Sequence, residues 1–442
     1  LRFAINRVMN KTSARDRLEQ ALSRIADPRG EGVRACLNVY AETARAAADA
    51  SDARARSGIS LGPLDGAIVS IKDLFDVKGE VTRAGSKILA EEGKPASADA
   101  PVVTRLRAAG AVIVAKTNMS EFAFHGIGTN PHFGAPGNPC DRARAPGGST
   151  SGGAVAVADG MCDIAIGSDT GGSTRAPAAF CGIVGWKPSR QRISTEGAFP
   201  LSFSLDSIGP MATSVADCAN TDAVMAGDWP HPVEAAPLAG LRFGIPQGFP
   251  LAQLDETVTA AFQAALKTLA KAGVRLSDET IPLLDDMVKA NALGGFAPAE
   301  AYAIHRDRLK RRGKDVDANV YARVSRGETI SAADYVDMNQ MRRRLVAAMD
   351  ARMSDFDALV LPTCPIVAPR LDEVATVETF GPKNMLTLRN TSTGNFFDLC
   401  AISLPMPRGK GSLATGLMLF GRNGHDARLF RIAAAVEKAL AA

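Results

Sequence analysis

The chain has 442 residues, 46% of them hydrophobic and 22% charged, a composition typical of a globular protein with a large buried core. Its 51 basic and 47 acidic residues leave a net charge of +4, which gives no reason to expect a nucleic acid or an anionic membrane as partner. No apolar stretch approaches the ~20 residues of a membrane helix. Residues 1–10 are too short and too interrupted in their apolar character for a secretory signal, so we expect a soluble, cytoplasmic protein. Whether residues precede Leu1 in the native chain is left open.

The cysteines and histidines argue against disulfides and metal chemistry. The seven cysteines are scattered, odd in number and free of Cys-x-x-Cys pairs, which is typical of reduced thiols in a cytosolic protein. The five histidines show no metal-ligand spacing, and no His-Glu-x-x-His motif occurs. We therefore expect no metal and no zinc-dependent hydrolysis.

The N-terminal segment is predicted to be helical from residue 13 to residue 57. Ser13 is placed to cap a first helix, in which Leu18, Leu22 and Ile25 recur at helical spacing. Residues 41–55 are alanine-rich and amphipathic and predict a second helix. We expect both helices to pack against the rest of the fold and to take no part in catalysis.

A buried strand around Ile68 carries the first candidate catalytic residue, Lys72. Lysine is rarely buried without a partner or a purpose, and burial disfavours its charged form, so a neutral amine becomes available as a base. The alternative is a lysine at the end of a strand that extends its amine to water. A helix at 100–109 and an apolar strand at 112–115 follow, and this alternation predicts an α/β sheet covered on both faces.

Residues 121–139 lead into a loop rich in glycine and proline. The segment contains His125, which suggests comparison with Ser–His catalysis, but no acidic partner at a recognisable spacing accompanies it. We therefore expect His125 to be a histidine of the loop or of the layer behind the site.

Two glycine pairs that each precede a serine are the most informative feature of the sequence. They lie in Gly-Gly-Ser-Thr-Ser-Gly-Gly (147–153) and in Gly-Ser-Asp-Thr-Gly-Gly-Ser-Thr-Arg (167–175). Between them, residues 152–160 predict a helix and residues 164–166 a strand. Such a path can bring Ser149 and Ser173 back to one place.

Loops of this kind suit a serine nucleophile. A serine hydroxyl needs a base, glycines let a substrate approach the main chain closely, and successive N–H groups can hold an oxyanion. The helix expected after Ser173 would direct its positive end to the same place. Flexible linkers are disfavoured because apolar, structure-forming segments flank both loops. Phosphate binding is disfavoured because no Gly-Lys-Ser/Thr follows either glycine cluster.

Beyond residue 233 the signals are mainly structural. Strands are predicted at 240–245, 355–362 and 414–421, helices at 255–272 and 426–440, and a largely helical stretch at 285–352. We expect the helical stretch to help build the substrate pocket. Core packing is the commoner role of such residues, but four are unranked candidates for the pocket: Met287, Phe296, Tyr302 and Met338.

Lys72 and the two glycine-serine runs together resemble the amidase signature family. Six further stretches look like landmarks of that family: 62–64, 99–103, 110–117, 180–182, 185–188 and 206–210. One glycine-serine loop alone would be weak evidence. Three catalytic elements in the expected order are strong evidence, and the resemblance covers nearly the whole chain, most densely from about 62 to 210.

The resemblance implies a single amidase domain (1–442) with a three-layer α/β/α fold around a central mixed β-sheet. Within it we expect a helical N-terminal segment (1–60), a catalytic core (about 62–210) and a variable, mostly helical segment that shapes the substrate pocket (about 250–355).

The resemblance also implies a Ser–cis-Ser–Lys triad. Ser173 matches the acylated nucleophile, and Lys72 matches the base. Ser149 matches the bridging serine, whose peptide bond with Gly148 is cis in the family.

Other residues are expected to support this triad. The expected oxyanion hole consists of four backbone N–H groups, those of Thr170, Gly171, Gly172 and Ser173. Three residues are expected to border the substrate: Gly126, Ile127 and Gly128. We also expect Asp169 and Arg175 to support the nucleophile loop by an ion pair, without proton transfer.

The sequence therefore predicts an amidohydrolase that cleaves a carboxylic amide to an acid and ammonia or an amine through a Ser173 acyl-enzyme, with no metal or organic cofactor. The first alternative is the glutaminase-like component of a tRNA-dependent amidotransferase, which shares the triad. A non-catalytic receptor or scaffold is the second, although such relatives lose catalytic residues that this chain keeps. The expected partner is a small-molecule amide; its identity and a homodimer are left open.

Overall fold

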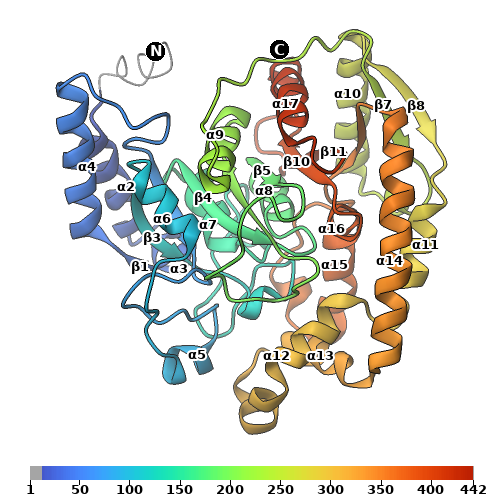
Figure 1. Cartoon of the computed structure of the whole chain (residues 1–442), viewed down its shortest axis with the longest axis horizontal. Coiled ribbons are helices and arrows are strands. Elements are labelled where there is room, and N and C mark those ends of the chain that lie inside the picture. The colour runs from blue at the N-terminus through green and yellow to red at the C-terminus, as the bar shows by residue number, and fades with distance from the viewer. Residues whose placement is uncertain (1–11, 442) are drawn as a thin grey trace.

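The computed structural model describes residues 12–441, in which one mixed β-sheet runs through the middle of the molecule (Figure 1). The prediction made for residues 1–10 lies outside the described residues. The strands lie side by side in the order β1 (Cys36–Val39), β3 (Val112–Thr117), β2 (Ile68–Lys72), β4 (Ile164–Asp169), β6 (Ser207–Ala212), β5 (Val184–Lys187), β10 (Cys400–Pro405), β11 (Gly416–Gly421), β9 (Ala358–Pro362), β7 (Arg242–Pro246) and β8 (Arg275–Glu279).

The sheet has two parallel regions joined by antiparallel strands. β2 is parallel to both β3 and β4, and β7 is parallel to both β8 and β9. The strands between these two regions pair antiparallel: β4 with β6, β6 with β5, β5 with β10, β10 with β11 and β11 with β9. β2 and β4 are parallel, so their C-terminal ends lie on the same side of the sheet. The candidate site lies at these strand ends.

Helices cover both faces of the sheet. The α-helices are α2 (Ala14–Ala26), α3 (Gly32–Ala35), α4 (Ala41–Arg56), α5 (Lys87–Glu92), α6 (Pro101–Ala108), α7 (Ser151–Ala158), α8 (Arg175–Cys181), α9 (Val215–Ala226), α10 (Glu256–Lys271), α11 (Leu283–Ala290), α12 (Phe296–Arg312), α13 (Ala318–Ser325), α14 (Ala332–Arg352), α15 (Val377–Arg389), α16 (Ser392–Phe396) and α17 (Asp426–Ala441). None of those in residues 12–441 is both long and apolar enough to cross a lipid bilayer.

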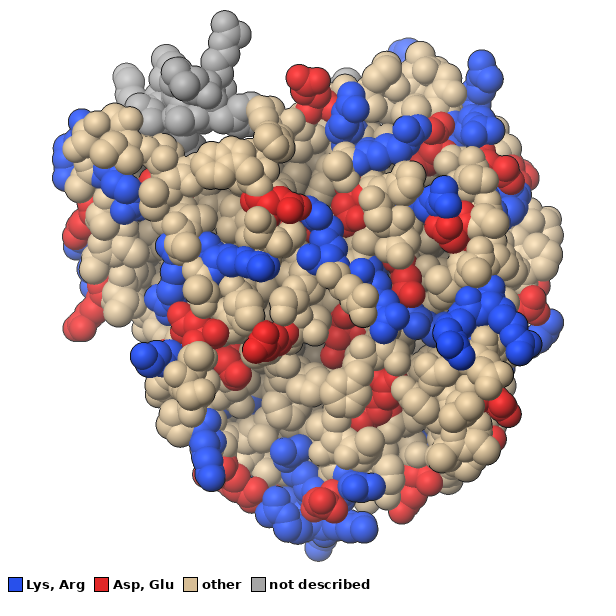
Figure 2. Space-filling view, in the orientation of Figure 1, with Lys and Arg blue, Asp and Glu red and all other residues tan. Residues whose placement is uncertain are grey.

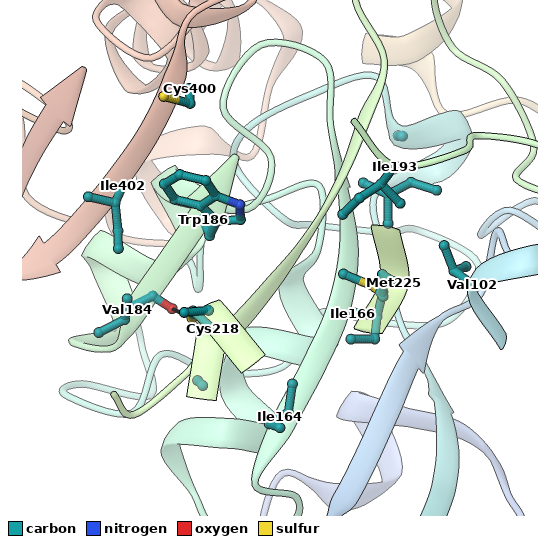
Figure 3. Close-up of a cluster of buried hydrophobic side chains, with 14 of the residues drawn as sticks. Val102, Ile164, Ile166, Val184, Trp186, Ile193, Cys218, Met225, Cys400 and Ile402 are labelled. Atoms are coloured by element: carbon teal, nitrogen blue, oxygen red, sulfur yellow. Dashed lines mark hydrogen bonds between the residues drawn. The ribbon is translucent and has the colours of Figure 1, made fainter. Parts of the chain in front are cut away.

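The apolar core lies on both sides of the strands because successive side chains of a strand point to opposite faces. Ile68 packs into a cluster with residues of α2 and α7, whereas Val69 and Ile71 pack into the cluster beneath α6, α9 and α17. Figure 3 shows the second cluster around Trp186, with Ile166 and Ile402 pointing into it from β4 and β10. The predicted three-layer α/β/α fold with a mixed sheet is confirmed.

Local signals placed most elements correctly. α2 begins at Ala14, and the side chain of Ser13 accepts a hydrogen bond from the N–H of Asp16 at 3.0 Å. α10 begins after Asp255, whose side chain caps it in the same way. The two helices predicted within residues 13–57 are present as α2 and α4, but β1 lies between them at the sheet edge, so the segment is not helical throughout. Four more strands had not been predicted as strands: β8, which is the other edge strand, and the central strands β5, β6 and β10.

Candidate active site

Lys72 lies at the end of β2 with its amine enclosed by hydroxyl groups. Its side chain is fully buried, which rules out the alternative of a lysine that reaches water. Its Nζ lies 2.7 Å from Oγ of Ser149 and 2.8 Å from Oγ of Ser168. Burial lowers the pKa of Lys72 to about 7, while the negative charges of Asp169 and Asp206 act in the opposite direction. A lysine with this pKa is partly uncharged at neutral pH and can accept a proton.

The first glycine-serine run turns tightly before α7 and presents Ser149 to Lys72. The peptide bond between Gly148 and Ser149 is cis. The N–H of Gly148 donates to the carbonyl of Gly126 at 2.7 Å, and that of Gly147 donates to the carbonyl of Ile127 at 3.1 Å. The segment expected to border the substrate, 126–128, therefore lies directly against this loop. Ile127 itself is fully buried among apolar neighbours.

The second glycine-serine run connects β4 to α8 and carries Ser173. The N–H of Thr150 donates to the carbonyl of Ser173 at 3.3 Å, so the two loops lie side by side. Gly172 has φ +133°, and a Cβ there would fall 2.0 Å from Oγ1 of Thr391, which explains why glycine is needed. Among the described residues, no hydrogen-bond acceptor is found for three of the four expected oxyanion donors, the N–H groups of Thr170, Gly171 and Ser173.

The fourth expected oxyanion donor is engaged elsewhere. The N–H of Gly172 donates to Oδ1 of Asp169 at 2.8 Å. It points toward the carboxylate that closes the loop and is therefore not free for an oxyanion in this arrangement.

The nucleophile loop is held by a buried ion pair. Asp169 and Arg175 are fully buried, with 2.8 Å between Oδ1 and Nη2, so the ion pair expected between them is present. Burial alone would raise the pKa of Asp169, but the guanidinium of Arg175 holds it well below its usual range. Arg175 also donates to the carbonyl of Thr391 and to Oδ1 of Asn395, at 2.8 and 2.7 Å. Both ends of the loop are thus fixed to the segment around α16.

His125 lies behind the first loop and has an acidic neighbour that the sequence did not reveal. Its Nδ1 lies 3.0 Å from Oγ of Ser120, and the N–H of Ser120 donates to the carbonyl of Ser149 at 3.1 Å. Its Nε2 lies 3.8 Å from Oδ2 of Asp317, the N-cap residue of α13. The acid is almost two hundred residues away in sequence, so no spacing rule could find it.

Two polar residues near Lys72 were missed as site residues by sequence reasoning. Ser168 contacts the amine directly, and Asp206 accepts a hydrogen bond from the hydroxyl of Thr170 at 2.6 Å. Both belong to stretches already noted, 167–175 and 206–210. Their position beside glycine-rich motifs was the only available signal.

The four candidates in the helical segment divide into two groups. Three belong to one apolar cluster and are buried there: Met287, Phe296 and Met338. The hydroxyl of Tyr302 donates to Glu328 at 2.9 Å on the exposed side. Core packing thus accounts for the first three. Within residues 12–441 no group of three or more His, Cys, Asp or Glu side chains is arranged to hold a metal ion.

The fold is that of an amide-hydrolysing enzyme. A solved structure described as an amidase superposes with a TM-score of 0.86 at 33% sequence identity, covering 97% of this chain and 97% of the other. The site lies where β2, β4 and the two glycine-serine loops meet, and this architecture defines the class of the protein.

The family model for amidases matches residues 16–430, and the chain belongs to the amidase family, whose enzymes act on amide C–N bonds. It is 36% identical to 2-amino-5-chloromuconic acid deaminase from Comamonas testosteroni, covering 91% of this chain and 88% of that protein. It is 38% identical to the A component of the glutamyl-tRNA(Gln) amidotransferase from Anaeromyxobacter dehalogenans (strain 2CP-C), covering 97% and 93%.

Proposed function

We propose that this enzyme hydrolyses a carboxylic amide to an acid and ammonia or an amine through an acyl-enzyme on Ser173. The observation that carries the proposal is the 2.7 Å contact between the buried amine of Lys72 and the hydroxyl of Ser149. A hydroxyl can donate to one neighbour while it accepts from another. Ser149 is therefore suited to relay a proton between Ser173 and Lys72.

The reaction follows from these roles. Uncharged Lys72 takes a proton from Ser149 as Ser149 takes one from Ser173, and the Ser173 oxygen attacks the amide carbon. Free backbone N–H groups of the 170–173 loop stabilise the oxyanion, a contribution of roughly 10²–10³ in rate for one good donor. The C–N bond then breaks, and the proton returns through Ser149 to the departing nitrogen. Water cleaves the ester on Ser173 by the same relay. No step requires a metal or an organic cofactor.

The test is an assay of ammonia release from a panel of simple amides, combined with mass spectrometry of the Ser173 peptide. We expect turnover of at least one amide and an acyl adduct on Ser173 in slowly deacylating cases. Turnover without any adduct, unchanged in a Ser173→Ala variant, would contradict the proposal.

The second candidate function is that of the glutaminase-like component of an amidotransferase, which the similarity to the glutamyl-tRNA(Gln) amidotransferase chain favours. The same panel separates the two functions when it includes glutamine. An amidohydrolase that works alone is expected to cleave amides without a preference for glutamine. A component of a larger complex is expected to prefer glutamine and to need its partners. A non-catalytic receptor would leave every amide intact.

The surface charges and the cysteine thiols support our proposals about the binding partner and the cellular compartment. Figure 2 shows basic and acidic side chains interspersed over one face, in keeping with the net charge of +4. We therefore propose a small-molecule amide as partner, without nucleic acid or membrane, and leave a homodimer as an open alternative. All seven cysteines are free, and six are buried, which supports a reducing compartment such as the cytoplasm.

A further inference from the structure

Asp206 is a carboxylate that reaches both the oxyanion loop and the surroundings of Lys72. It directly precedes β6, and it lines a cavity of about 580 Å³ whose wall also includes Ser168. Ser168 in turn lies 2.8 Å from the amine of Lys72. The cavity therefore approaches the base from the side of β4 and β6.

The hydrogen bonds of Asp206 join two loops. Its Oδ1 accepts from the hydroxyl of Thr170 at 2.6 Å, and Thr170 is the first residue of the oxyanion loop. Its Oδ2 accepts from the N–H groups of Leu201 and Ser202, both at 3.0 Å. A carboxylate with three donors is well fixed in position. Thr170 is therefore attached to a rigid acceptor.

Among the described residues, the carboxylate of Asp206 is not neutralised by a direct ion pair. In residues 12–441 no arginine, lysine or histidine forms an ion pair with it, in contrast to Asp169, which is paired with Arg175. Burial raises the pKa of Asp206 to about 6, so the group is mostly ionised at neutral pH. The negative charges of Asp206 and Asp169 both favour the charged form of Lys72. Asp206 itself is affected by the nearby carboxylate of Glu300, which raises its pKa.

The loop that carries Asp206 is fixed to the helical segment by Glu300 of α12. Oε2 of Glu300 accepts from the hydroxyl of Ser202 at 2.7 Å and from the N–H of Ser204 at 3.0 Å. Its Oε1 accepts from the hydroxyl of Tyr335 of α14 at 2.6 Å. Two helices of the variable segment thus hold the 201–206 loop against the catalytic strands.

We propose that Asp206 is a positioning residue of the amide hydrolysis: it fixes the oxyanion loop through Thr170, and its negative charge stabilises Lys72 once that lysine has been protonated through Ser149. The inference rests on the proposed function, because it assigns Lys72 as the base. Burial favours the uncharged amine before the reaction, and the nearby carboxylate favours the charged amine afterwards. The two effects together keep proton transfer close to balance.

The experiment uses a fluorophosphonate, which forms a P–O bond to a serine Oγ and loses fluoride, so that no particular amide is needed. The rate of modification of Ser173 is followed by mass spectrometry from pH 5 to pH 10. Only uncharged Lys72 can accept the serine proton, so the rate is expected to rise with pH and to level off. In Asp206→Asn a negative charge beside Lys72 is lost, and its protonated form becomes less favourable. The midpoint is therefore expected at lower pH, by roughly 0.5–1 unit.

Glu300→Gln is the matched control. It removes a carboxylate that contacts the 201–206 loop, and it leaves the carboxylate of Asp206, which acts on Lys72, in place. We expect its midpoint to stay at the wild-type value. Thr170→Val removes a hydrogen bond that helps to keep Asp206 ionised, so its midpoint is not compared. The plateau is reached at a pH where Asp206 is charged, and there we expect a rate at least about tenfold lower. It also serves as a second test if Asp206→Asn does not fold.

Two results would overturn the inference alone: a wild-type midpoint in Asp206→Asn, or a wild-type plateau rate in Thr170→Val. The first would remove the role of its charge and the second that of its hydrogen bond to Thr170; both together would mean that Asp206 only closes the 201–206 turn. An unreactive Ser173 in the unmodified enzyme would contradict the proposed function itself, and the inference with it.

Discussion

Two buried lysines at strand ends differ in the hydrogen-bond partners of their amines. Lys72 ends β2 and Lys187 ends β5, and each side chain is at most 1% exposed. Burial lowers the pKa of both, to about 7 for Lys72 and about 8 for Lys187. Their partners differ. Lys72 contacts two hydroxyls, whereas Lys187 donates to two backbone carbonyls, those of Pro188 and Leu399, both at 2.8 Å.

The difference shows that burial alone does not make a base. A carbonyl oxygen can only accept a hydrogen bond. The two carbonyls beside Lys187 therefore bind its amine as a donor but have no proton to give to it. A hydroxyl can also donate, so Ser149 can pass a proton to Lys72. On this account Lys72 acts in catalysis and Lys187 stabilises the junction between β5 and the residues before β10.

The largest effect is expected from Ser173→Ala, which removes the nucleophile. Turnover of the best amide in the panel should fall about 10⁴-fold or more, because no other group can form the acyl-enzyme. The matched control is Ser151→Ala, which alters a buried serine of the other glycine-serine run whose hydroxyl has no hydrogen-bond partner among the described residues. That variant should keep its activity within a few-fold. Equal losses in both variants would indicate a folding defect.

Lys72→Met should come next. The substitution keeps an unbranched, buried side chain and removes the amine, so kcat/KM at pH 7 should fall by about 10²–10⁴-fold, the usual contribution of a general base. Circular dichroism should show the native fold. Neutral-pH activity at the wild-type level would rule out Lys72 as the base.

Asp169→Asn should mainly affect stability. It leaves the guanidinium of Arg175 buried without its counter-ion, a change that typically costs about 3–5 kcal/mol. The free energy of unfolding is measured by urea titration. Activity should fall as well, because the carboxylate fixes the 170–174 loop by accepting from Gly172 and Thr174. Wild-type stability would mean that the ion pair does not support the loop.

Lys187→Met should have the smallest effect on catalysis. It tests whether Lys187, unlike Lys72, has only a structural role. Two buried carbonyls lose their donor, at a cost of roughly 1–3 kcal/mol in unfolding free energy. The kcat/KM at 25 °C should stay within about tenfold of wild type, because Lys187 contacts none of the hydroxyls of the site. A loss as large as that of Lys72→Met would remove the distinction between the two lysines.

The elements with strong local patterns were predictable from the sequence. β2 and β4 are short apolar runs next to glycine-rich turns, and α2 and α10 carry their own capping residues, Ser13 and Asp255. β1 and β8 were not predictable because edge strands are partly exposed and have no continuous apolar pattern. In β8 none of the five residues is fully buried, and three are charged.

At the candidate site, the sequence pointed to the proposed catalytic residues but not to the residues that support them. Lys72, Ser149 and Ser173 stand out because glycine-rich runs and a lysine in an apolar strand are unusual. Their supporting partners come from distant parts of the chain: Asp317 for His125, Asn395 for Arg175 and Glu300 for the loop of Asp206. Contacts over such separations depend on tertiary packing, which leaves no mark on local sequence.

The most direct test is the pH dependence of kcat/KM for the best amide substrate between pH 5 and pH 10. Since burial lowers the pKa of Lys72 to about 7, the account predicts a rate that rises about tenfold per pH unit below pH 7 and is level above it. A rate that still rises tenfold per unit up to pH 10, as the ordinary lysine pKa of about 10.4 would give, or a level profile down to pH 5, would contradict the claim that an uncharged Lys72 drives the reaction.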